Sequence, residues 1–477
     1  MRTLLLFIIL IPNTLSAQRG LTKKYSPEQC QEVFNNVITL LKTSHPGTFR
    51  YHSKADFEEY AASVSFTMRD SMTELELYRK LKPLVTYMGC LHTELITAVN
   101  YKGWLDKSPN LVPLQLFWEG KRAFVTVNLS ENINIVPGDE VLEINGRRIP
   151  ALLDLLLPVI PADGYNQSMK YLALYHLFPL LYRSNVEVLD SFRITWMHMG
   201  NKITSVVPAV GRCEFARRGL LSEYVYSKQL VFTTTDSMAV LTIHSFANTA
   251  IKAGKQHFKT FIDQVFDTLK VRGVPNLIID LRYNTGGSDV NAAYFSSYFF
   301  DKPYRYWDRI EVTATVAGKV KGLGSLLFHK PVQRDSAWLW QKGKTVKDFD
   351  FTELQQPAAN HYNGKVYVLI NGFSMSSCAD VAAILSHNRK AVFIGTETGG
   401  GYQGNNSGII PGVNLRPTKL VLSVPLMAYY NAVDATVNMG RGTMPDIPVD
   451  LTLTDILNNV DRPMKVAMDQ INRKGSL

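Results

Sequence analysis

The residue types best suited to catalysis lie between Asn371 and Asp380, in the segment Asn-Gly-Phe-Ser-Met-Ser-Ser-Cys-Ala-Asp. The apolar run 366–370 before it predicts a strand, and the Ala-rich run 381–385 after it predicts a helix. A serine at such a turn faces free backbone N–H groups and the positive end of the helix dipole. That position suits a nucleophile whose reaction develops an oxyanion. The structural alternative is that Ser377 only caps the helix, since Ser377-x-x-Asp380 has capping-box spacing.

Three glycine-containing segments accompany the serines along the chain. They are residues 280–287 (Asp-Leu-Arg-Tyr-Asn-Thr-Gly-Gly), 395–401 (Gly-Thr-Glu-Thr-Gly-Gly-Gly) and 440–449 (Gly-Arg-Gly-Thr-Met-Pro-Asp-Ile-Pro-Val). The first follows a short apolar strand at 277–279, and its Gly-Gly pair lets backbone N–H groups approach a ligand closely. We expect Asp280 and Arg282 to pair and hold this turn, not to take part in chemistry.

In this order, the four segments resemble the core of the C-terminal processing (tail-specific) peptidases, family S41. The family pattern is D-L-R-x-N-x-G-G, then an S-x-x-E helix, a G-E-x-T-x-G turn and a late G-x-G-x-x-P-D segment. The match covers residues 237–450 and departs from the pattern at Asp380, where Glu is usual, and at Thr396, which replaces a glutamate. The resemblance implies an α/β fold: a crotonase/ClpP-like S41 protease core with a PDZ-like β domain and an N-terminal helical domain.

The resemblance also implies a nucleophile, which in the family lies three residues before the acidic helix residue and here is Ser377. Many members pair this serine with a lysine just after the G-E-x-T-x-G turn. The matching position is Gly401, and no lysine follows until Lys419, which argues against a Ser–Lys mechanism.

A second branch of the family, similar to the tricorn-type core peptidases, takes a histidine base from an upstream D-x-H-T-like segment. Residues 89–95 (Gly-Cys-Leu-His-Thr-Glu-Leu) look like that segment, with Cys90 in place of the acidic residue. The resemblance therefore implies His92 as the base. His244, directly after the strand at 238–243, is the rival candidate, although a histidine at a strand end is more often structural.

The implied mechanism is serine-type peptide hydrolysis through a Ser-His dyad and an acyl-enzyme, with no cofactor and no metal. Backbone N–H groups of Gly286, Gly287 and Cys378 are expected to form the oxyanion hole. A third residue orienting the histidine stays open; the candidates are Glu94, Glu397, Asp434 and Asp446.

Two other classes of function compete with a peptidase. The missing lysine and Cys90 would suit a non-catalytic protein that binds peptides or other ligands on the same scaffold. A crotonase-like acyl-CoA enzyme has the same kind of strand-to-helix turn and an oxyanion hole. Export argues against it because CoA esters are cytoplasmic, and the chain shows no phosphate cradle.

Export is predicted from the N-terminus, where Arg2, an apolar run at 4–11 and small residues up to Ala17 form a signal-peptide pattern. The mature protein is expected to be periplasmic or secreted, with no integral membrane segment. The net charge of +10 is spread without a Lys/Arg block, which does not suggest a nucleic-acid partner. Four cysteines are too few and too scattered for a disulfide framework or a zinc site.

We expect four parts along the chain. They are a signal peptide at 1–17, a helical region at 18–104 that carries the base, a PDZ-like domain with a helical insertion at 105–212, and the peptidase core at 213–477. PDZ modules add an extended peptide to a sheet edge and capture its C-terminal carboxylate. The expected partner is therefore a protein or peptide substrate, and recognition of its C-terminus is one way of selecting it.

Overall fold

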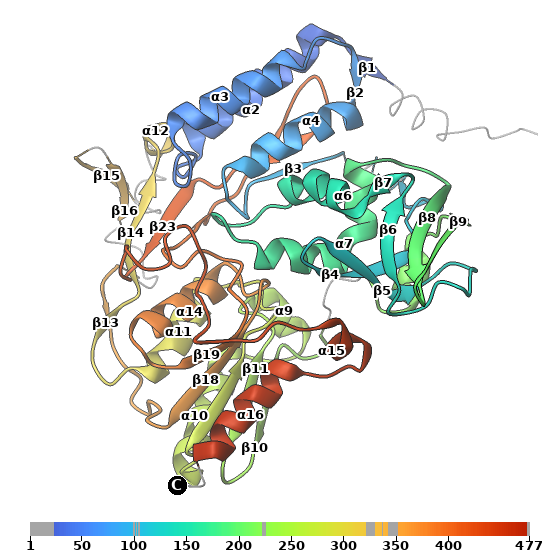
Figure 1. Ribbon diagram of the computed structural model, residues 1–477. Helices are drawn as coiled ribbons and strands as arrows, with labels where there is room; N and C mark the ends of the chain where they lie inside the picture. Colours follow the sequence, from blue (N-terminus) through green and yellow to red (C-terminus); the bar gives the residue numbers. More distant parts are fainter. Residues whose placement is uncertain are drawn as a thin grey trace, which may run out of the picture.

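The computed structural model describes residues 23–98, 101, 103, 105–221, 226–320, 330–335, 337–341 and 352–474. The signal-peptide pattern at 1–17 lies outside these residues. The described chain forms a helical layer at its start, a β unit beside it, and a large α/β core that holds the second half (Figure 1).

The N-terminal region is helical over most of its described residues. Its helices are α2 (Pro27–Ser44), α3 (Lys54–Phe66) and α4 (Glu74–Tyr87), and a short ladder joins β1 (Lys24–Tyr25) to β2 (Met72–Thr73). Capping boxes fix the starts of α2, at Ser26, and α4, at Thr73. After α4 the chain turns at Gly89, which has φ +66°, and runs through His92 into β3 (Glu94–Ile96).

The β unit contains a six-stranded sheet in the order β4-β5-β6-β8-β9, with β7 paired to β6. The strands are β4 (Leu114–Glu119), β5 (Arg122–Asn128), β6 (Glu140–Ile144), β7 (Arg147–Arg148), β8 (Ser191–His198) and β9 (Asn201–Pro208). A tight turn at Asn145-Gly146 joins β6 to β7, and both residues have positive φ. The predicted helical insertion consists of α6 (Ile149–Leu156), η1 (Leu157–Val159) and α7 (Ser168–Asn185).

The core is a second six-stranded sheet, in the order β10-β11-β12-β18-β19-β24. Its strands are β10 (Leu230–Thr234), β11 (Ala239–Ile243), β12 (Asn276–Asp280), β18 (Lys365–Ile370), β19 (Val392–Gly395) and β24 (Ile447–Pro448). All neighbouring pairs are parallel except β10 with β11. This confirms the α/β alternation expected from the sequence.

Helices cover both faces of the core sheet. One face packs against α10 (Phe258–Arg272), α11 (Asp289–Ser296) and α14 (Ser377–His387), and the other against α16 (Arg462–Lys474). Along β12, Leu277 and Ile279 belong to the first cluster and Ile278 to the second, as side-chain alternation requires. The remaining helices are α8 (Arg212–Arg217), α9 (Asn248–Ala253), η2 (Ser297–Phe299), α12 (Ala314–Lys319) and α15 (Leu453–Leu457).

Three smaller sheets connect the regions. One has the order β15-β16-β14-β23-β20, one pairs β13 with β17, and one has the order β21-β22-β3. Their strands are β13 (Tyr304–Arg305), β14 (Trp307–Val312), β15 (Lys330–Arg334), β16 (Ala337–Gln341), β17 (Leu354–Gln355), β20 (Asn406–Ser407), β21 (Gly412–Asn414), β22 (Val421–Ser423) and β23 (Met427–Asn431). The pairing of β3 with β22 is decisive for the site, because it ties the chain beside His92 to the peptidase-like half.

Candidate active site

The start of α14 has an unusual backbone conformation. Ser376 precedes the helix with φ 54° and ψ −134°, outside the regions that non-glycine residues normally occupy. Its side chain makes no capping hydrogen bond to the helix. Gly286 packs closely against it: a Cβ at Gly286 would lie 2.7 Å from the Ser376 Cβ. Such strained positions occur where a structure holds one side chain for a purpose, and here that side chain is a hydroxyl.

His92 reaches this hydroxyl from the other end of the chain. Its Nε2 atom lies 3.2 Å from the Ser376 Oγ, across 284 residues of sequence. The Nδ1 atom has no hydrogen-bond partner within the described residues, although the backbone of Asn406 lies near enough to favour the protonated ring. Burial outweighs that effect and lowers the pKa of His92 to about 4, so the imidazole is neutral at pH 7. A neutral ring at this distance can accept the proton of the serine.

Ser377, which the family spacing selects as the nucleophile, is the first residue of α14. Its side chain is 1% exposed, and its hydroxyl has no hydrogen-bond partner in the described chain. The capping-box interpretation is therefore wrong, because neither serine caps the helix through its side chain. The structure brings His92 to Ser376 and not to Ser377.

The candidate oxyanion donors differ in whether their N–H groups already have an acceptor. The N–H of Gly286 donates to the Asn284 Oδ1 at 2.9 Å, and the N–H of Cys378 donates to the Met375 carbonyl at 3.0 Å. The N–H groups of Gly287 and Ser377 have no acceptor among the described residues. The N–H groups of Gly287, in the Gly-Gly turn, and of Ser377, which follows Ser376, are thus free to donate to a ligand.

The other polar candidates have separate partners. His244 stacks on Tyr226 with ring centroids 3.4 Å apart, and its pKa is lowered by burial. Glu397 forms a bidentate pair with Arg441. The remaining carboxylates bind elsewhere: Glu94 pairs with Lys82, Asp434 with Thr436, and Asp446 accepts the Phe393 N–H. None of the four candidate carboxylates contacts His92.

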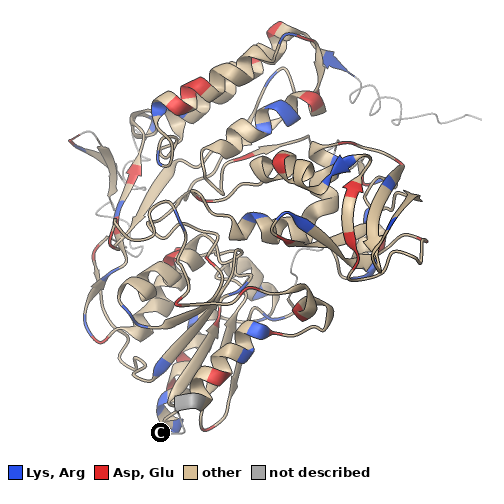
Figure 2. Cartoon of the chain, in the orientation of Figure 1, with Lys and Arg blue, Asp and Glu red and all other residues tan. Residues whose placement is uncertain are grey.

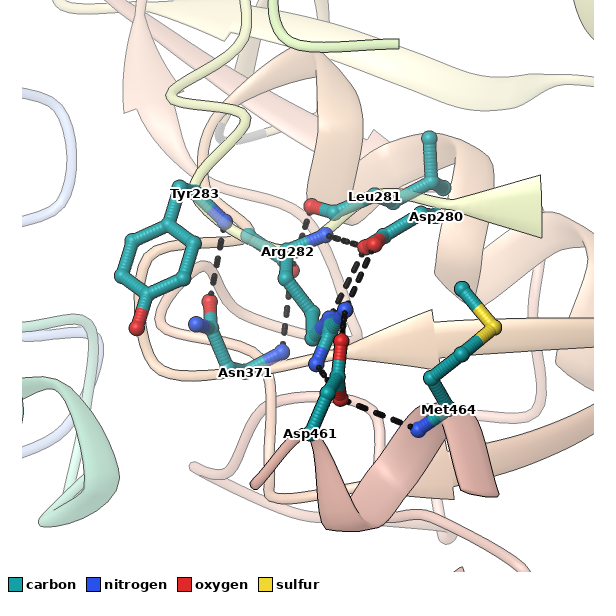
Figure 3. A network of polar contacts seen from close by, with 8 residues as sticks. Asp280, Leu281, Arg282, Tyr283, Asn371, Asp461 and Met464 are labelled. Carbon is teal, nitrogen blue, oxygen red and sulfur yellow. Dashed lines mark hydrogen bonds and ion pairs between the residues drawn. The ribbon is translucent and has the colours of Figure 1, made fainter. Parts of the chain in front are cut away.

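Asp280 and Arg282 pair as expected, and the structure adds a third member to the network (Figure 3). The Arg282 guanidinium also binds Asp461, at the start of α16, with contacts of 2.7 and 2.8 Å. Next to it, the Tyr283 N–H donates to the Asn371 Oδ1 at 3.1 Å. This joins the two loops that lead to the Gly-Gly turn and to the serines.

A cavity of about 480 Å³ opens between the β unit and the carboxyl ends of the core strands. Its wall is mostly apolar and aromatic, with Phe117 and Trp118 from β4, Tyr171 and Leu172 from α7, and Tyr283 from the core. Neither Ser376 nor His92 lines it. Such a cavity between two units is a typical place for a ligand or part of a substrate.

Charges are distributed over the described chain without a continuous basic face in the view of Figure 2. Within the described residues, no group of three or more His, Cys, Asp or Glu could hold a metal ion. No described helix is long and apolar enough to cross a membrane. All four cysteines are free.

An α/β sheet whose strand-to-helix turn presents a strained serine to a histidine, next to unpaired N–H groups, defines a hydrolase of the serine type. Comparison with known families agrees, because residues 237–449 match the model of peptidase family S41. Residues 237–449 are therefore similar to an S41 peptidase domain, and the chain is a serine-type peptidase.

Solved structures show the same fold over nearly the whole chain. A mutant of CPAF matches with a TM-score of 0.66 and 13% identity, covering 94% of this chain and 98% of that one. Mature CPAF complexed with lactacystin matches with a TM-score of 0.62 and 14% identity, covering 94% and 99%. No curated protein matches the chain.

The family spacing selects Ser377 and sets Ser376 aside, whereas the structure places Ser376, one residue earlier, within reach of His92. The signal for Ser376 is conformational, because it lies directly before the first helical residue with a positive φ. Two adjacent serines at 376 and 377 give no compositional means of choosing between them.

Proposed function

We propose that this chain hydrolyses peptide bonds with a Ser-His dyad formed by Ser376 and His92. The observation that carries the proposal is the 3.2 Å separation of the Ser376 Oγ and the His92 Nε2, at a serine held with φ 54°. Ser377 is the second candidate, because the family spacing selects it and its buried hydroxyl has no partner.

The reaction follows from the donors and acceptors around Ser376. As the Oγ bonds to the carbonyl carbon of the substrate, its proton passes to the His92 Nε2. The carbonyl oxygen becomes an oxyanion, which the N–H groups of Ser377 and Gly287 stabilise. His92 then protonates the leaving amine as the C–N bond breaks. In the second half, His92 takes a proton from water as the water oxygen attacks the ester carbon. The ring then returns this proton to the Ser376 Oγ as the ester C–O bond breaks, which restores both residues.

The test is hydrolysis of a fluorescein-labelled casein by the wild-type chain, His92→Ala and His244→Ala. We expect loss of turnover in His92→Ala and retention in His244→Ala, whose ring stacks on Tyr226 away from the dyad. Full activity in His92→Ala would refute the proposal.

Substrate selection is a second part of the proposal. One edge of β4 pairs with no strand among the described residues, and residues of β4 and α7 line the apolar cavity. An extended polypeptide could therefore add to this edge and place an apolar side chain in the cavity. The charges near the cavity do not favour a terminal carboxylate there. Arg282 is already paired with Asp280 and Asp461, and Asp450 is exposed. Equal cleavage of a peptide and its C-terminal amide would support apolar selection, and a strong preference for the free acid would support chain-end recognition.

We also propose that the protein is exported. The support is the signal-peptide pattern of residues 1–17. Mass determination of the mature protein from the producing cells tests it: cleavage after Ser16 or Ala17 is expected, and an intact N-terminus in the cytoplasm would refute it.

A further inference from the structure

The turn that carries His92 is held by a loop of the β unit. This loop, residues 160–167, joins η1 to α7, and at its centre lies Asp163, which is 1% exposed. One carboxylate oxygen accepts the Leu91 N–H at 3.0 Å, and the other accepts the Gly401 N–H at 3.1 Å. A single side chain thus joins the residue next to His92 to the glycine turn of the core.

Backbone hydrogen bonds also join this loop to the His92 turn and to the core. Gly164 donates its N–H to the Gly89 carbonyl at 2.9 Å, and Tyr165 donates to the Gly440 carbonyl at 2.8 Å. A Cβ at Gly164 would lie 2.2 Å from the Gly440 carbonyl oxygen, so only glycine permits this approach. Asn166 adds a bond from its Nδ2 to the Thr398 carbonyl at 2.7 Å. The loop therefore contacts the His92 turn and two segments of the core at once.

We propose that Asp163 is a positioning residue that sets the distance between His92 and the serine at the start of α14. The proposal rests on the proposed role of His92 as the base. Asp163 touches neither the serine nor the substrate; it acts through the Leu91 N–H, one residue from the imidazole. Where the family pattern has an acidic residue two positions before the histidine, this chain has Cys90, and Asp163 supplies a carboxylate to the same turn from another part of the sequence.

Asp163 joins the His92 turn to the core only while both of its carboxylate oxygens accept hydrogen bonds. An ionised carboxylate has two acceptor oxygens, whereas a protonated carboxyl or an amide turns one of its two positions into a donor. That donor would face the N–H of Leu91 or Gly401, and one of the two bonds would be lost. A displacement of about 1 Å in a catalytic group can reduce a rate by roughly 10²-fold.

Burial raises the pKa of Asp163 to about 6, while the N–H groups of Leu91 and Gly401 and the charge of Arg50 oppose the shift. The other ionisable groups that interact with Asp163 are Tyr51, Cys90 and Asp380. Since His92 titrates near pH 4, loosening of the turn near pH 6 should be visible as a separate step in the rate.

The test uses Asp163→Asn, which keeps the shape of the side chain, and Asp139→Asn as the matched control. Asp139 is also a buried aspartate of the β unit that accepts from two nitrogen donors, Val136 N and His198 Nδ1, each at 2.9 Å. The rate of inactivation by a fluorophosphonate probe is measured between pH 4.5 and 8, together with the thermal unfolding midpoint of each variant.

We expect Asp163→Asn to react about 10²-fold more slowly than wild type at pH 7.5. We also expect it to lose the step near pH 6, while Asp139→Asn keeps both the rate and the step. An unchanged rate and an unchanged pH profile in Asp163→Asn would overturn the proposal. If Asp163→Asn fails to fold, the wild-type profile decides: a rate that shows no step between pH 5 and pH 7 would overturn the proposal.

The experiments distinguish a failure of the proposed function from a failure of the positioning role. Normal labelling of His92→Ala would remove the base and leave Asp163 with a structural role only, whereas loss of labelling in His92→Ala with no effect of Asp163→Asn would refute only the positioning role.

Discussion

At the scale of single residues, the two neighbouring serines show how strongly side-chain chemistry depends on backbone conformation. Ser376 and Ser377 are the same residue type and are adjacent in sequence. Only Ser376 has a positive φ and lies within hydrogen-bond distance of His92. Ser377 instead offers its N–H to the site while its hydroxyl is buried. The proposed nucleophile and the first proposed oxyanion donor thus come from consecutive residues.

Asp380 carries a testable consequence for stability. It is buried on α14, accepts a hydrogen bond from Asn405 at 3.1 Å, and has its pKa raised to about 8 by burial and by the charge of Asp289. Because this pKa lies above the unfolded value, the folded state holds an extra proton between the two values. The stabilising contribution is present at low pH and is lost as the pH rises toward about 8.

Asp380→Asn should therefore weaken the fall of the thermal unfolding midpoint between pH 5 and pH 8. The remaining slope would come from two other carboxyls with raised pKa values, the buried Asp163 and the half-buried Asp289. The same slope in wild type and variant would show that Asp380 does not titrate in this range.

At the scale of elements, the Gly-Gly turn after β12 is shaped to fit the start of α14. Gly286 has φ 95°, and an added Cβ would lie 2.7 Å from the Ser376 Cβ and 3.1 Å from the Ser377 N. Gly273, which ends α10 with φ 60°, has open space around it and provides a matched control.

Gly286→Ala should reduce fluorophosphonate labelling by about 10²-fold because it displaces the serine. Gly273→Ala should cost stability by about 1–2 kcal/mol, the strain of a side chain in the left-handed region, without reducing labelling. Equal labelling rates in the two variants would contradict the close approach of the turn to the serine.

The elements of the core were predictable because each has strong local signals. The apolar runs at 277–279 and 366–370 became β12 and β18, and the Ala-rich run at 381–385 became part of α14. His92 was reached through a resemblance, since no local pattern joins a turn after α4 to a serine 284 positions later. The sequence around Asp163 shows only an Asp-Gly turn between apolar helices. Its proposed role could not be predicted, because its two hydrogen bonds join segments that are far apart in the sequence.

At the scale of the whole molecule, the site is assembled from all three regions. In the proposed site, the helical region supplies His92, the β unit supplies Asp163, and the core supplies the serines and the Gly-Gly turn. The pairing of β3 with β22 and the bonds of Asp163 hold these parts together. A displacement of the β unit would therefore also move His92.

The cavity between the β unit and the core allows a test of substrate selection. Leu172 lines the cavity, whereas Leu177 lies on the same helix, is 37% exposed and does not line it. Leu172→Lys should raise KM for a casein substrate by about tenfold, because burial of an apolar side chain contributes about 1.5–3 kcal/mol. Labelling by a small probe should not change.

Leu177→Lys is the matched control and should leave KM unchanged. If Leu172→Lys and Leu177→Lys had the same effect on KM, the cavity would have no part in substrate binding.

The central claim is that the serine at the start of α14 is activated by His92 and that this serine is Ser376. The most direct measurement is mass-spectrometric mapping of a fluorophosphonate adduct on the mature chain, with Ser376→Ala, Ser377→Ala and His92→Ala as comparisons. We predict an adduct on Ser376, absent in Ser376→Ala and His92→Ala and retained in Ser377→Ala. An adduct on Ser377 that persists in Ser376→Ala, or labelling that survives the loss of His92, would contradict the account.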